Sequence, residues 1–176
     1  SRLGLGNLAV YSRQQSPFDP GQLQVELATH IDTRYRAREA SLPELAALVR
    51  RWLAEVSGNS IVYFPSYHYL RAALELIADG LPGRSLWVQQ PELSDLARDE
   101  LLALFGRSRN LVAFCILGGI FGEGIDLPGE RLRSVVVVGA DGRVARRIEA
   151  AGFVADDLRV APGGGLVALD ARLDRV

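Results

Sequence analysis

The chain has 176 residues, a formal net charge of −1 at pH 7 and 48% hydrophobic residues, which suits one α/β domain with a core of its own. No apolar run approaches the roughly twenty residues that span a bilayer, and no signal peptide opens the sequence, so we expect a soluble cytoplasmic protein without a membrane partner. All its basic residues are arginine, which excludes the lysine of a Walker A loop and therefore a complete P-loop ATPase within this chain.

The first part of the chain is mixed in character. Apolar stretches predict short strands at Leu8–Tyr11 and Leu23–Ala28, and the polar segment 34–39 is expected at the surface. Ser41 and Glu44 form a capping box, which predicts a helix that begins at Ser41. The apolar face of this helix repeats at helical spacing and comprises Leu45, Leu48, Val49, Trp52, Leu53 and Val56.

From Ser60 onward, strands and helices alternate. Apolar runs predict four strands: Ile61–Phe64, Leu86–Val88, Leu111–Leu117 and Val135–Val138. Ser66 is expected to cap a helix whose inner face holds Leu70, Leu74 and Ile77. A second helix is predicted from about Ser94 to Phe105, with Leu96, Leu101, Leu102 and Phe105 inward. This alternation predicts an α/β fold, doubly wound, with a mostly parallel sheet and helices on both faces.

The third of these strands contains Cys115, the only cysteine. A single cysteine excludes an internal disulfide and an iron–sulfur cluster held within this chain, so we expect a buried, inert thiol. After Gly139, the spacing of Val144, Ile148 and Ala151 predicts a short helix, and Leu166–Leu169 a final strand. The absence of methionine indicates that Ser1 begins a fragment.

Two segments follow predicted strands at the edge where ligands bind in doubly wound folds. In the first, residues 58–67, Ser66 and Tyr67 bring hydroxyls and a helix N-terminus just past a strand, where a phosphate could be held. The alternative is structural, with Ser66 only capping the helix and Tyr67 only packing. In the second, residues 117–129, five glycines surround Glu123 and Asp126. Those carboxylates could meet a ribose hydroxyl, a water or an arginine, or they could be solvated in a flexible loop.

Together the two segments resemble motifs IV and V of the XPD/DinG-type superfamily 2 DNA helicases. The sequence Gly58-Asn59-Ser60-Ile61-Val62-Tyr63-Phe64-Pro65-Ser66-Tyr67 is similar to the family's G-N-x-x-V-x-F-P-S-Y strand. The sequence Gly119-Ile120-Phe121-Gly122-Glu123-Gly124-Ile125-Asp126 is similar to its G-x-F-x-E-G-I-D loop. Residues 16–18, 32–36 and 38–39 resemble the preceding segment of the bacterial members, and Gln89-Gln90 resembles a glutamine-rich motif. The resemblance covers roughly residues 1–139.

The resemblance implies roles for particular residues. Ser66 and Tyr67 would contact the DNA backbone, with Gln89 nearby. Gly122, Glu123, Gly124 and Asp126 would bind the nucleotide, with Asp126 at the ribose. Arg143 and Arg146, within a G-R-x-x-R sequence, would be the arginine fingers of motif VI. The family has a glutamine where Gly139 stands and a longer stretch before motif VI, so a solvated face carrying both arginines remains an alternative.

The resemblance implies the second RecA-like motor domain of an ATP-dependent DNA helicase of a kind associated with DNA repair. Residues 1–40 would be a segment packed on the motor domain of residues 41–176. A missing N-terminal RecA-like motor domain would supply the Walker A lysine and the ligands of Mg2+, so this chain alone should hydrolyse no ATP. Single-stranded DNA would be the other partner.

Two alternatives stay open. One is a non-catalytic RecA-like module that binds a nucleotide or a partner and has lost motor function. The other is a Rossmann-type enzyme, which the G-G-x-x-G-x-G spacing of residues 118–124 disfavours.

Overall fold

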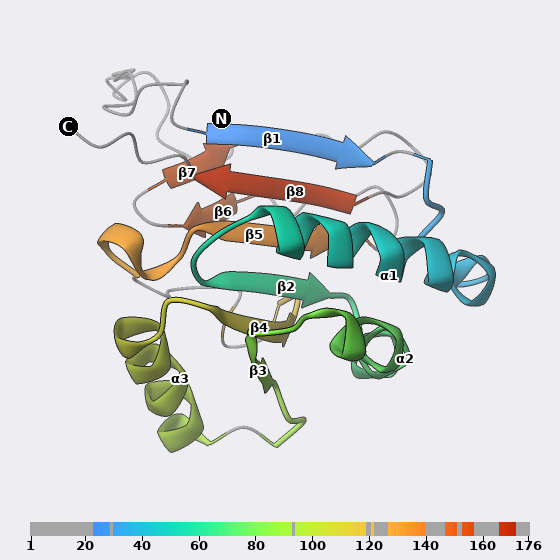
Figure 1. Ribbon diagram of the computed structural model, residues 1–176. Coiled ribbons are helices and arrows are strands. Elements are labelled where there is room, and N and C mark those ends of the chain that lie inside the picture. Colours follow the sequence, from blue (N-terminus) through green and yellow to red (C-terminus); the bar gives the residue numbers. More distant parts are fainter. Residues whose placement is uncertain are drawn as a thin grey trace, which may run out of the picture.

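The computed structural model describes residues 23–28, 30–92, 94–118, 121, 127–139, 147–150, 153–156 and 166–171. A six-stranded sheet with the order β1-β8-β5-β2-β4-β3 forms the centre of the fold, and β6 and β7 form a separate pair (Figure 1). The strands are β1 (Leu23–Ala28), β2 (Ser60–Phe64), β3 (Ser85–Val88), β4 (Leu111–Ile116), β5 (Ser134–Val138), β6 (Arg147–Ala150), β7 (Phe153–Asp156) and β8 (Leu166–Ala171). The helices are α1 (Arg38–Glu55), α2 (Tyr67–Ile77) and α3 (Asp95–Arg107), with short 3-10 turns η3 (Ala78–Gly80) and η4 (Gly129–Arg131). Within these ranges no helix has the length and apolar character that a bilayer crossing requires.

The four strands β5, β2, β4 and β3 are parallel neighbours. β8 runs antiparallel to both β5 and β1, so β1 points in the same direction as β2. The predicted mostly parallel α/β sheet is therefore confirmed. The carboxyl ends of β1, β2, β3 and β4 all lie at one edge, which we call the carboxyl edge.

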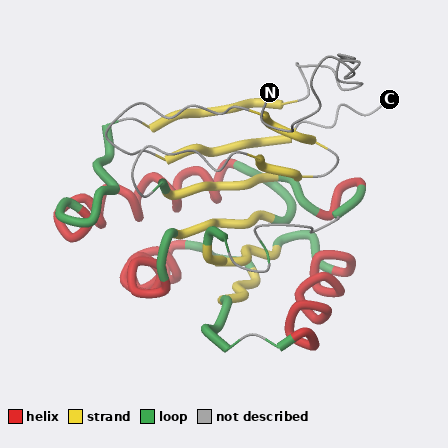
Figure 2. The backbone as a smooth tube through the Cα atoms, turned by 180° about the vertical axis from the view of Figure 1, so that it is seen from behind, coloured by secondary structure: helices red, strands yellow, loops and turns green. Residues whose placement is uncertain are grey.

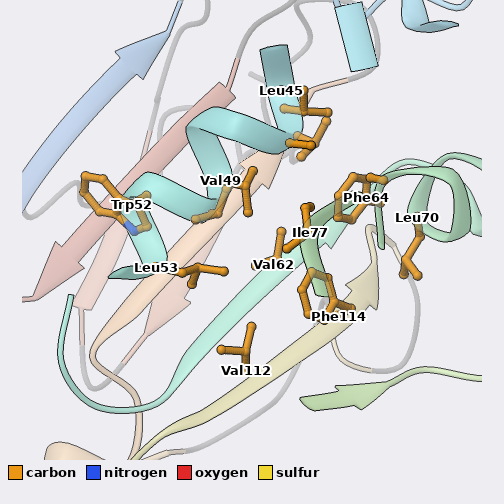
Figure 3. Packing of buried hydrophobic residues seen from close by; sticks show 14 of the residues in the cluster. Leu45, Val49, Trp52, Leu53, Val62, Phe64, Leu70, Ile77, Val112 and Phe114 are labelled. Carbon is orange, nitrogen blue, oxygen red and sulfur yellow. The ribbon is translucent and has the colours of Figure 1, made fainter. Parts of the chain in front are cut away.

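Helices cover both faces of the sheet, as predicted. Along β2, Val62 and Phe64 enter a core shared with α1 and α2, whereas Ile61 enters a second core shared with α3. The first core contains Trp52 of α1 (Figure 3). The Trp52 indole N–H donates to Ser134 Oγ of β5 at 3.2 Å. A strand that is buried on both faces needs apolar residues at every position, which explains the uninterrupted apolar runs of β4 and β5.

Three predictions of local structure are corrected. The first helix begins at Arg38, and Ser41 lies inside it. The Ser41 hydroxyl donates to the carbonyl of Asp32 at 2.6 Å instead of capping the helix. Leu96, predicted to face inward, is 76% exposed because α3 is buried through Leu101 and Phe105.

The third correction concerns the segment predicted to be a helix around Ile148. Residues Arg147–Ala150 form β6, which pairs antiparallel with β7 in the register Ala150 to Phe153. Ala151 and Gly152 separate the two strands in the sequence, a spacing typical of a two-residue hairpin connection as well as of a helix end. The predicted final strand at Leu166–Leu169 is confirmed as part of β8.

Candidate nucleic-acid and nucleotide site

Ser66 lies directly after β2 and begins α2. Its backbone is extended, with φ −161° and ψ 153°, and its hydroxyl oxygen accepts from the Tyr69 amide at 3.4 Å. The predicted N-cap is therefore confirmed. Among the described residues, no acceptor takes the Ser66 hydroxyl proton, so the side chain caps the helix and retains one donor.

Tyr67 and Gln89, the other two predicted DNA contacts, are hydrogen-bonded to each other. Gln89 is 5% exposed, and its Nε2 donates to the Tyr67 hydroxyl at 3.1 Å. Its Oε1 accepts from the Ile116 amide at 2.9 Å. The Tyr67 hydroxyl in turn donates to the Gln90 carbonyl at 3.1 Å. These bonds join the start of α2 to the ends of β3 and β4, so the position of the half-buried Tyr67 ring is fixed.

The resemblance implies that Gln89 contacts DNA, and in the structure its side-chain amide is hydrogen-bonded within the protein. Both ends of the amide have protein partners, and the side chain is buried. The structure therefore gives Gln89 a positioning role toward Tyr67. A glutamine directly after the edge strand β3 is the signal that could have indicated this role, because a buried amide needs several partners.

The glycine-rich segment after β4 is anchored at Phe121, which is 2% exposed. The Tyr63 hydroxyl of β2 donates to the Phe121 carbonyl at 2.6 Å. The Trp87 ring of β3 packs edge-on against the Phe121 ring, with centroids 5.4 Å apart and planes at 86°. Burial raises the pKa of Tyr63, so its hydroxyl keeps the proton that it donates. Neither Tyr63 nor Trp87 is a predicted site residue; the polar group of Tyr63 inside an otherwise apolar strand was the available signal.

The predicted nucleotide-binding residues Gly122, Glu123, Gly124 and Asp126 lie outside the described residues, as do Arg143 and Arg146. The structure thus brings Ser66, Tyr67 and Gln89 together at the carboxyl edge. It also places Phe121, next to Gly122 in sequence, against the same strands that carry this group.

Comparison with known proteins agrees with the motifs. Residues 49–154, more than half of the chain, match the family described as "Helicase C-terminal domain". Two solved structures are similar at low identity. Xpd4 of S. tokodaii is 21% identical, with a TM-score of 0.40, over 49% of this chain and 17% of that chain. UvsW of T4 is 18% identical, with a TM-score of 0.41, over 53% of this chain and 18% of that chain. The matched regions are thus less than a fifth of the length of those proteins. Because the family match covers more than half of the chain, including β2 to β5 and both motif segments, the chain belongs to the helicase C-terminal domain family.

Proposed function

We propose that the chain is the second motor domain of an ATP-dependent DNA helicase and that Ser66 and Tyr67 contact single-stranded DNA. The observation that carries this proposal is that Ser66, which caps α2, directly precedes Tyr67, and that Gln89 holds the Tyr67 hydroxyl by a hydrogen bond at the carboxyl edge. A protein surface that moves along single-stranded DNA must present its polar groups in a fixed geometry. Gln89 fixes the position of the Tyr67 hydroxyl from within the protein.

The chemistry of the edge suits phosphate. Ser66 keeps a hydroxyl donor and stands at the N-terminus of the eleven-residue helix α2, whose first amide groups point toward the edge. The Tyr67 hydroxyl donates to Gln90 and accepts from Gln89, which leaves one lone pair and the ring face for a nucleotide. Contacts of this kind recognise the backbone and the base faces rather than a sequence.

The proposal that this chain contributes to ATP binding rests on its sequence motifs. ATP with Mg2+ would bind between this domain and an N-terminal RecA-like motor domain. That partner would supply the Walker A lysine, which this chain lacks. Glu123, Asp126, Arg143 and Arg146 would approach the nucleotide from this side. The contacts of Tyr63 and Trp87 with Phe121 support this proposal. They join the residue just before Gly122 to β2 and β3, the strands that lead to Tyr67 and Gln89.

The test of the DNA contact is fluorescence anisotropy of a labelled single-stranded oligonucleotide titrated with this chain at several salt concentrations. Ser66→Asp and Ser66→Asn form a matched pair, since both side chains cap helices well and only the first adds a negative charge. We expect Ser66→Asp to weaken binding about tenfold or more through repulsion of phosphate, and Ser66→Asn to bind nearly as the wild type does. Equal affinities of the two variants would remove Ser66 from the DNA surface.

A second test concerns the motor. Joined to an N-terminal motor domain of the same family, the chain should support ATP hydrolysis that single-stranded DNA stimulates. Hydrolysis that is absent in the joined protein, although both domains are folded, would favour a RecA-like module without motor function. Hydrolysis by the purified chain alone would contradict the division of the site between two domains.

A further inference from the structure

The described part of the connection between β1 and α1, residues 30–37, lies at the carboxyl edge beside the start of α2. β1 and β2 point in the same direction, so the chain leaves β1 at the edge where Ser66 and Tyr67 lie. Figures 1 and 2 show the beginning of α1 and the beginning of α2 on the same side of the sheet in both views. This connection precedes motifs IV and V and includes residues 32–36, which resemble the preceding segment of the bacterial members.

Tyr35 is the most exposed large hydrophobic residue of the described chain, with 82% of its surface accessible. The Tyr35 ring nevertheless has a cation–π contact with Arg38 of α1. The Arg38 guanidinium lies 5.7 Å from the Tyr35 ring centroid and 4.8 Å from that of Tyr69. Arg38 Nε also donates to the Thr33 carbonyl at 3.0 Å. Tyr69 belongs to α2 and receives the Ser66 cap at its amide, so Arg38 links the Tyr35 ring to the Ser66 site.

Two arginines flank Tyr35 in sequence, and only one of them is paired with a carboxylate. Arg34 is held by Asp32, with Nε 2.9 Å from Oδ1 and 3.0 Å from Oδ2. The side-chain hydrogen bond from Arg34 lowers the pKa of Asp32 to about 2, so this pair stays ionised and Arg34 is neutralised. Arg36 is exposed and makes no ion pair with another described residue. The connection therefore presents one open aromatic ring beside one unneutralised cation.

We propose that Tyr35 and Arg36 form a second nucleic-acid contact, in which a base of single-stranded DNA stacks on Tyr35 and a neighbouring phosphate pairs with Arg36. The inference rests on the proposed function and extends its track from Ser66 and Tyr67 to the connection between β1 and α1. An exposed aromatic ring beside an arginine is the combination that binds unpaired bases together with their phosphates. A protein partner would be expected to cover a wider apolar area than a single ring.

The experiment measures the affinity of this chain for a labelled oligothymidylate and for an abasic strand of equal length. Tyr35→Ala should weaken binding to oligothymidylate about fivefold or more and leave abasic binding unchanged, because only the first probe has bases to stack. Tyr35→Trp, which keeps an aromatic ring, should bind oligothymidylate about as tightly as the wild type does. Leu96→Ala is the matched control, since Leu96 is 76% exposed on α3, which packs on the opposite face of the sheet.

A parallel pair of variants tests the phosphate contact. Arg36→Gln should reduce the slope of log affinity against log salt by about 0.7, the value for one phosphate contact on a single strand. Arg107→Gln, at the exposed end of α3, should leave the slope unchanged.

The outcomes separate this inference from the proposed function. If Ser66→Asp weakens binding while Tyr35→Ala has no effect, the second contact is wrong and the motor-domain proposal stands. If Tyr35→Ala weakens binding to both probes equally, the proposal that a base stacks on Tyr35 is wrong. If the wild-type chain does not bind either probe at low salt, both proposals fail for this chain.

Discussion

The hydroxyl of Tyr63 donates a 2.6 Å hydrogen bond to the backbone carbonyl of Phe121, which lies 58 residues further along the chain. Tyr63 is on β2, the strand that leads to Ser66, and Phe121 opens the segment that resembles motif V. The contact therefore connects the segment proposed for the nucleotide with the strand that positions the proposed DNA contact. Phe121 is 2% exposed and Tyr63 is half-buried, so the bond is partly shielded from water.

Tyr63→Phe should keep the packing of this contact and remove its hydrogen bond. We expect a loss of about 1–3 kcal/mol in the free energy of unfolding, because the Phe121 carbonyl is left buried without its donor. Urea denaturation of the chain measures this loss. Tyr35→Phe is the control, since the exposed Tyr35 should tolerate loss of its hydroxyl without a change in stability. Equal stabilities of Tyr63→Phe and the wild type would contradict the importance of this bond.

Gln89→Leu should both destabilise the chain and weaken its binding of single-stranded DNA. Leucine fills a similar volume but leaves the Ile116 amide unpaired and releases the Tyr67 hydroxyl from one partner. The expected cost is about 1–3 kcal/mol of stability. Anisotropy at a temperature where the variant is fully folded should show weaker DNA binding, because Tyr67 loses its fixed position. Unchanged DNA affinity in a folded Gln89→Leu variant would show that Tyr67 does not need this support.

Much of this architecture could be predicted from sequence because its central strands are buried on both faces. A run such as Val135–Val138 permits few other interpretations, and Ser66 before a helix pattern gave the correct cap. The sequence did not indicate that β8 lies between β1 and β5, because pairing between Leu23 and Ala171 spans nearly the whole chain.

Errors arose where local signals competed with tertiary contacts. The capping box at Ser41 was a plausible helix start, but Ser41 bonds to Asp32 and the helix extends back to Arg38. The DNA role of Gln89 stays a prediction from the resemblance of Gln89-Gln90 to a motif, and the sequence did not indicate that its amide is hydrogen-bonded to Ile116 and Tyr67. Sequence patterns report which residues are polar, and only the fold shows which polar groups already have partners.

Asn59→Ala should be among the most destabilising single substitutions in the described core. The Asn59 amide is fully buried and has four backbone groups within hydrogen-bond distance. The two hydrogens of its Nδ2 are shared among the carbonyls of Phe105, Ser108 and Arg131, and its Oδ1 accepts from the Leu111 amide. We expect a loss of about 3 kcal/mol or more, measured by urea denaturation, since several buried backbone groups lose their partner.

Asn110→Ala provides the comparison for this prediction. Asn110 donates to the Gly83 carbonyl from an exposed position, where water can replace the lost bond. Its substitution should cost less than about 1 kcal/mol. If the two variants were equally stable, the Asn59 contacts would not be the link that holds β2, α3 and η4 together at the amino edge of the sheet.

The thiol of Cys115 should make the stability of the chain depend on pH in the alkaline range. Burial raises the pKa of Cys115 above that of an unfolded cysteine, about 8.5, so the folded state holds the thiol proton more tightly. This contribution is fully present below pH 8.5 and is lost as the pH rises, at up to about 1.4 kcal/mol per pH unit. Urea denaturation between pH 7.5 and about 9.5 should therefore show a steeper loss for the wild type than for Cys115→Ala. The same burial predicts that iodoacetamide labels Cys115 only after denaturant is added, and rapid labelling of the folded chain would contradict both expectations.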